Sequence, residues 1–224
     1  MRQGISEVLP FAIGIAISPI PIIAIILILF SNRARVNGPA FLLGWIVGLA
    51  AAATVVYLVT DAASASSDTT ASDTVSWGKI VLGLLLLGLA RRNWAERPAP
   101  GEAGELPNWM ASVEAISPVR AFGLAIVLSV ANPKNLVLAV GAAAGLGQLT
   151  LSTGDAVVAL VVFVALASLS ILFAVLYDLV GGEHAQRTLD DMKAWLTSHN
   201  HAVMTVLFLV FGVVLFSKGL GLLS

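Results

Sequence analysis

The sequence has no cysteine and little charge. Only 11% of its 224 residues are charged, whereas soluble domains carry about 25%. The absence of thiols excludes disulfides, thiolate metal sites and thiol-based redox relays. In contrast, 58% of the residues are hydrophobic. This composition predicts an all-α protein that crosses a membrane several times, because helices satisfy their own backbone groups in lipid.

Several functional signatures are also missing. The formal net charge of −1 offers no basic surface to a nucleic acid. The sequence contains no G-x-S-x-G, Walker A or H-E-x-x-H pattern, so we expect no enzymatic activity, no catalytic residue and no cofactor. The histidines His184, His199 and His201 have no acidic companion at a metal-ligand spacing, and no metal site is predicted.

Six hydrophobic runs are predicted to be transmembrane helices, judged against the roughly 20 residues that a helix needs to cross a bilayer. They are Val8–Phe30, Pro39–Thr60, Val75–Ala90, Pro118–Val140, Ala156–Leu179 and Ala202–Leu220. The first run follows Arg2, but it is long and contains prolines. It is therefore predicted to be a retained span and not a cleaved signal peptide.

Basic residues are distributed unevenly among the connections. Eight lie in or beside the first, third and fifth: Arg33, Arg35, Arg91, Arg92, Arg97, Arg120, Arg187 and Lys193. Three lie on the other side: Arg2, Lys79 and Lys218. Cytoplasmic loops carry an excess of Lys and Arg. The sequence thus predicts a multi-pass plasma-membrane protein with both termini extracytoplasmic.

The fourth run is interrupted at Asn132-Pro133-Lys134-Asn135. A cation near the bilayer centre costs about 2.5–3.5 kcal/mol on insertion scales. Pro133 also removes the N–H that would bond the carbonyl of Ser129. Freed backbone groups at membrane depth persist only where protein or water satisfies them. These residues predict a broken helix that faces an internal cavity.

The first run has a matching interruption at Ser18-Pro19-Ile20-Pro21. At 1.5 Å per residue, Pro19 lies about 15 Å from the outer start of its span and Pro133 about 21 Å from the inner start of its span. Both depths are near the middle of a roughly 30 Å core. Paired breaks in two halves indicate the central site of a transporter. We predict that this site contains Ser18, Pro19, Ile20, Pro21, Asn132, Pro133, Lys134 and Asn135, with Ile20 close to Lys134. The Lys134 ammonium is expected to bond carbonyls freed by proline, on Ser129, Ile15 or Ile17.

The interruptions divide the chain into two similar parts. Residues 1–90 are predicted to form a first three-helix repeat, 91–117 a cytoplasmic linker and 118–224 a second repeat, all in one integral membrane domain. With three spans in each part, the second repeat enters the membrane from the opposite side. The predicted architecture is therefore a 3+3 inverted repeat with broken first and fourth helices.

Other patterns concern the surface and the packing. Two apolar stripes at helical spacing predict helices lying on the inner surface or gating the inner mouth. They are Trp109, Met110, Val113 and Ile116, and Leu189, Met192, Trp195 and Leu196. The small residues Gly44 and Gly48, and Gly141 and Gly145, predict close helix packing within the chain.

The six-span layout and the two breaks resemble the lysine exporter superfamily. Its amino-acid exporters have Pro-Gly-Pro in the first span and Asn-Pro-Lys in the fourth, whereas Pro19-Ile20-Pro21 lacks the central glycine. The long charged third connection and the Ser/Thr/Asp-rich second one are more similar to the GAP branch. These peptidoglycolipid addressing proteins include the sulfolipid-addressing proteins of actinobacteria. The resemblance implies export of glycolipids or lipopeptides across the plasma membrane.

Two other functions stay open. One is a secondary exporter of a small solute such as an amino acid, and the other is a non-transporting scaffold for a lipid export complex. A lipid carrier predicts a lateral opening with an apolar path for the tails, whereas a small-solute exporter predicts a closed polar cavity. The expected partners are a lipid or glycolipid and the membrane, with a homodimer or a lipid biosynthesis or export machinery as further candidates.

Overall fold

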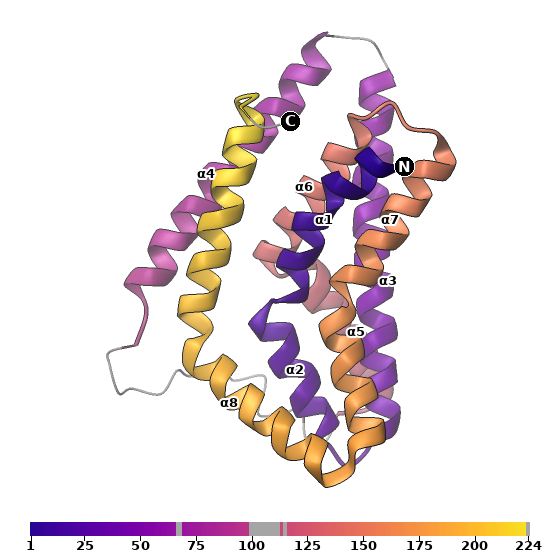
Figure 1. Ribbon diagram of the computed structural model, residues 1–224, viewed down its shortest axis with the longest axis vertical. Coiled ribbons are helices and arrows are strands. Elements are labelled where there is room, and N and C mark those ends of the chain that lie inside the picture. The colour runs from indigo at the N-terminus through magenta and orange to yellow at the C-terminus, as the bar shows by residue number, and fades with distance from the viewer. Residues whose placement is uncertain (66–68, 99–112, 114–115, 223–224) are drawn as a thin grey trace.

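The computed structural model describes residues 1–65, 69–98, 113 and 116–222 (Figure 1). Within these residues the chain forms eight α-helices and no β-strand, which confirms the all-α prediction. The helices are α1 (Arg2–Ala16), α2 (Pro19–Leu29), α3 (Ala34–Ala65), α4 (Thr69–Ala95), α5 (Pro118–Val130), α6 (Pro133–Gly147), α7 (Thr153–Ala167) and α8 (Leu169–Gly219).

Two pairs of helices are bent at the predicted prolines. The bend is 53° between α1 and α2 and 64° between α5 and α6. Ser18 and Asn132, which precede these prolines, have extended backbones with φ/ψ of −71°/117° and −70°/114°. A proline ring disfavours helical geometry in the residue before it. The breaks in the first and fourth predicted spans are thus confirmed.

The number of spans is confirmed only in part. Among the described residues, α8 and the Ala34–Ala62 part of α3 are long and apolar enough to cross a membrane, and the two bent pairs raise the number to four. The apolar stretch of α4 between Lys79 and Arg91 is too short to cross roughly 30 Å of hydrocarbon by itself. The six-span layout therefore stays a prediction.

Helix α8 reverses direction at Gly182. This glycine has a φ of 53° and a ψ of −139°, a conformation that residues with a Cβ rarely adopt. In Figure 1, α7 and the start of α8 run down one side, and α8 then turns and rises beside α4 to the C-terminus. The helix thereby joins the predicted fifth and sixth spans.

The predicted stripe in the fifth connection is helical and lies within α8. Leu189 and Leu196 are buried, whereas Trp195 is exposed. The stripe therefore packs partly against the protein. In the third connection, Val113 is buried and Ile116 packs against the core, while Trp109 and Met110 lie outside the described residues.

Both ends of the chain lie at the same end of the molecule (Figure 1). The N-terminal amine of Met1 is 3.1 Å from a carboxylate oxygen of Asp155 at the start of α7. The α2–α3 connection and the bend in α8 lie at the opposite end. This arrangement agrees with the predicted sorting of the connections, and the end that faces the cytoplasm stays a prediction.

Glycines allow the bent pairs to pack closely. A Cβ at Gly44 would overlap the backbone of Phe122 on α5, and one at Gly48 would overlap the side chain of Ser129. Gly141 and Gly145 likewise place α6 directly against α1. Both small-residue patterns thus pack helices within the chain, as predicted.

Candidate functional site

The two helix breaks meet at Lys134. Its Nζ donates a 2.8 Å hydrogen bond to the carbonyl oxygen of Gly14 on α1, and the residue is only 1% exposed. The predicted contact between the first and fourth spans is therefore confirmed. The acceptor is neither of the carbonyls predicted on α1, those of Ile15 and Ile17. The closeness of Ile20 to Lys134 stays a prediction.

A shift in the last turn of α1 explains why Gly14 is the acceptor. Pro19 has no N–H to give to the carbonyl of Ile15. The N–H of Ser18 bonds that carbonyl instead, at 3.0 Å, and tightens the turn. The carbonyl of Gly14 thereby loses its helical partner, which would have been Ser18. The ammonium of Lys134 takes that place.

The second break is held by its own side chains. The Oδ1 of Asn132 accepts from the backbone N–H of Lys134 at 3.1 Å and caps α6. The Nδ2 of Asn135 lies 3.4 Å from the carbonyl oxygen of Leu128. The Oγ of Ser129 donates to the carbonyl of Ile126 at 2.8 Å. Most of the polar groups of this break are therefore used locally.

The two breaks are equivalent in backbone but not in chemistry. Ile17 N–H bonds the carbonyl of Ile13 in the first break, and Ala131 N–H bonds that of Val127 at the corresponding place in the second. Ser18, unlike Asn132, makes no side-chain cap. The charge at the crossing thus comes from one break and its acceptor from the other.

Polar capacity remains around Lys134. An ammonium has three donors, and the described residues provide one acceptor, Gly14. The Oγ of Ser18 and the Oδ1 of Asn135 are buried and make no hydrogen bond within the described part of the chain. No carboxylate of that part lies within 4.0 Å of Lys134, although several other cations form such pairs. The Lys134 ammonium and the Ser18 hydroxyl can therefore donate to a further polar group, and the Oδ1 of Asn135 can accept from one.

A second polar cluster lies nearer the termini, and the sequence reasoning missed it. Lys218 forms a salt bridge of 2.5 Å with Glu7, and their side chains are 12% and 13% exposed. Lys79 donates a 2.5 Å hydrogen bond to Gln148. Glu7 and Gly14 are seven residues apart, so they share one face of α1. This spacing is visible in the sequence and indicates that Glu7 lies on the same side of the helix as the break. It was missed because the first span was predicted to begin at Val8.

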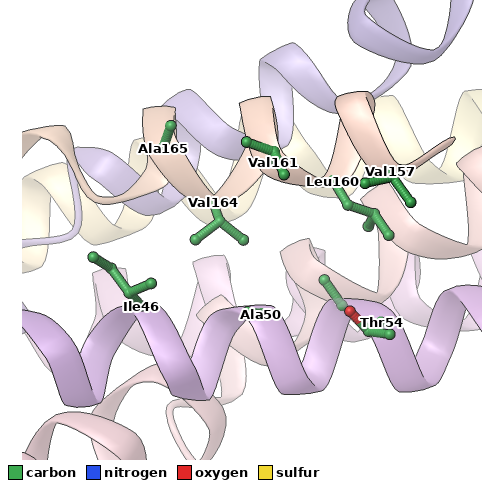
Figure 2. Close-up of a pocket in the computed structure, with 9 residues that line it drawn as sticks. Ile46, Ala50, Thr54, Val157, Leu160, Val161, Val164 and Ala165 are labelled. Atoms are coloured by element: carbon green, nitrogen blue, oxygen red, sulfur yellow. The ribbon is translucent and has the colours of Figure 1, made fainter. Parts of the chain in front are cut away.

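An apolar groove of about 480 Å³ lies between α3 and α7. Figure 2 shows Ile46 and Thr54 of α3 pointing toward Leu160 and Val164 of α7. The lining is aliphatic apart from the hydroxyl of Thr54. Val161, which also lines the groove, is 61% exposed. The groove therefore opens sideways on the surface of the helix bundle.

These features define an all-helical protein with apolar helices that can cross a membrane and a buried polar crossing between two broken helices. The family model of Sap, the sulfolipid-1-addressing protein, matches residues 8–221. The chain belongs to this family. The match confirms the predicted resemblance to sulfolipid-addressing proteins and associates the chain with lipid export or addressing. None of the curated proteins and none of the solved structures matches the chain.

Proposed function

We propose that the protein exports an anionic glycolipid or lipopeptide across the plasma membrane, with the anionic head group passing Lys134. The observation that carries the proposal is the buried ammonium held by the Gly14 carbonyl of the opposite broken helix. Charges interact strongly where the dielectric is low. An anionic oxygen would therefore compete well with a neutral carbonyl for this ammonium.

The neighbouring polar atoms support a head-group site. Ser18 and Asn135 have buried oxygens with unused hydrogen-bonding capacity among the described residues, and buried polar groups normally have a partner. In the proposal the head group displaces the Gly14 carbonyl from Lys134. Its anionic oxygens accept hydrogen bonds from the Ser18 hydroxyl and the Asn132 amide nitrogen, and one of its hydroxyls donates to the Oδ1 of Asn135. The prolines maintain the breaks that free these groups.

We propose that transport relies on a 3+3 inverted repeat with both termini outside. The contacts between helices support it. The contact of α1 with α7 corresponds to that of α5 with α3, and the contact of α2 with α8 corresponds to that of α6 with α3. The remaining helix of the first repeat, α4, packs against α8. Rocking of one repeat against the other would expose Lys134 to each side in turn. An ion or proton gradient or a partner machine would supply the energy.

A lipid substrate is favoured over a small solute by the groove between α3 and α7. A small solute needs a closed polar cavity, whereas this groove is aliphatic and opens sideways. The remaining alternative, a scaffold for an export complex, makes a different prediction. Export by a scaffold would survive replacement of Lys134 and fail when the third connection is deleted.

The test is export of the native lipid by cells carrying Lys134 variants at matched membrane abundance. Hydrogen bonds to charged groups contribute about 1.5–3 kcal/mol, so Lys134→Gln should lower export about tenfold or more. Lys134→Arg should also fail, because a planar guanidinium does not replace a compact ammonium in a tight site. Lys193→Gln, which removes a lysine paired with Asp190, is the control. Wild-type export by Lys134→Gln would refute the proposal.

A further inference from the structure

The groove between α3 and α7 lies level with the second helix break. Gly48 of α3 packs against Ser129, which precedes the break. Further along α3, Thr60 packs against Gly147 at the end of α6. The groove-lining stretch from Ile46 to Thr54 lies between and beside these contacts. It therefore starts level with the break, on the face of α3 turned away from Ser129, and extends along α3 for about 12 Å, at 1.5 Å per residue. The two groove helices pack against the helices of the crossing: α6, which carries Lys134, packs against α3, and α1, which carries Gly14, packs against α7.

The groove also communicates with the lipid-facing surface. Val157 and Val161, which line it on α7, are exposed. The flanking residues Leu43 and Val47 on α3 are exposed as well. In a bilayer such aliphatic surfaces face hydrocarbon. An acyl chain can therefore enter the groove sideways without leaving an apolar environment.

Resting on the proposed function, we infer that this groove binds one acyl chain of the lipid whose anionic head group lies at Lys134. Lipid tails are as apolar as the leucines of a membrane protein, so burial in the groove gains no hydrophobic energy. The gain comes from close van der Waals contact with the aliphatic walls and from anchoring of the head group. Occupation of the groove should consequently depend on the charge of the head group.

The test uses the purified full chain in phosphatidylcholine vesicles with a trace of photoreactive lipid. The probe is phosphatidylglycerol with a diazirine in one acyl chain, and the comparison is phosphatidylcholine with the same photoreactive chain. Mass spectrometry locates the labelled residues. Labelling by the anionic probe should concentrate on Ile46–Thr54 and Val157–Ala165 and exceed labelling by the neutral probe about tenfold, which corresponds to about 1.4 kcal/mol.

Adjacent alanines provide a matched pair of variants. Ala50 lines the groove, whereas Ala51 is exposed and lies outside the lining. Ala50→Phe should remove most of the groove labelling, and Ala51→Phe should leave it unchanged. If Ala50→Phe does not fold, Val161→Phe in the lining and Val158→Phe beside it provide the same comparison on α7.

The outcomes separate this inference from the proposed function. Equal labelling by both probes, labelling of other helices, or crosslinks between two copies in place of lipid labelling would each overturn the acyl-chain site. These results would leave the export test of Lys134→Gln unaffected. Conversely, preferential groove labelling by the anionic probe, together with normal export by Lys134→Gln, would refute the role of Lys134 in export and support the groove as a lipid site.

Discussion

The two helix breaks have nearly the same backbone and opposite roles at the point where they meet. Ser18 and Asn132 differ by only a few degrees in φ and ψ, and each precedes a proline that starts a new helix. After the proline, however, one break continues with Ile20 and the other with Lys134. Repetition of a backbone can thus create the opening, while divergence of one side chain supplies the charge.

The breaks also differ in what maintains them. Asn132 caps α6 through its side chain, whereas Ser18 makes no such cap and α2 depends on its proline. Replacing each proline by alanine therefore tests the comparison, with the largest effect expected at the first break. Pro19→Ala restores an N–H to the carbonyl of Ile15 and returns the Ser18 N–H to Gly14, which favours a continuous helix over the 53° bend and closes the opening at Lys134.

Export should consequently fall more for Pro19→Ala than for Pro133→Ala, although Pro133 is the neighbour of Lys134. Export at matched membrane abundance measures both variants. A restored backbone bond of about 0.5–1.5 kcal/mol in favour of the closed helix predicts a fall of about two- to twelvefold for Pro19→Ala. A larger loss of export for Pro133→Ala would contradict the expectation that the first break depends more on its proline than the second.

A second prediction concerns the stability of the fold and the ion pair between Glu7 of α1 and Lys218 of α8. Glu7 lies on the same face of α1 as Gly14, and its partner Lys218 is mostly buried. Removing one partner of a buried pair costs about 3–5 kcal/mol, and the partial exposure here reduces the expected cost to about 2 kcal/mol. Glu7→Gln should lower the thermal unfolding temperature in detergent.

The matched control for Glu7→Gln is Glu96→Gln. Glu96 pairs with Arg92 four residues earlier on α4, and both side chains are well exposed. Such pairs contribute about 0.3–0.5 kcal/mol, so the unfolding temperature should hardly change. Similar shifts for the two variants would show that the Glu7–Lys218 pair does not hold α1 in place.

A comparable effect is expected where α3 packs on α5. Gly44→Ala would overlap the backbone of Phe122 and should destabilise the fold by about 1–3 kcal/mol. Gly123→Ala is the control, because a Cβ there meets nothing within 4 Å in the described part of the chain. It should be neutral or slightly stabilising. The thermal unfolding temperatures of the two variants are compared in the same detergent. Equal temperatures would show that close packing at Gly44 does not stabilise the fold.

The sequence predicted the breaks because the cause is local. A proline lacks an N–H and restricts the residue before it, so Pro19 and Pro133 indicate their own positions. The acceptor of Lys134 could not be predicted in the same way. It depends on Ser18 donating to Ile15 and not to Gly14, a choice made by the geometry of the last turn.

Other parts of the fold required the three-dimensional structure. Glu7 had an unremarkable place near the N-terminus, and only the packing of α1 between α6 and α8 buries it beside Lys218. The sideways groove combines residues of α3 and α7 that are about a hundred positions apart. Neither feature has a local signature, because both arise from which helices become neighbours.

The central claim is that the Lys134 ammonium selects an anionic head group, and lipid binding tests it most directly. Native mass spectrometry of the purified protein would compare a sulfated glycolipid with its desulfated form, which has identical acyl chains. A charged hydrogen bond of about 1.5–3 kcal/mol predicts a preference of about tenfold or more for the sulfated lipid. Lys134→Gln should abolish this preference. Equal binding of the two lipids by the wild type, or an unchanged preference in the variant, would contradict the account.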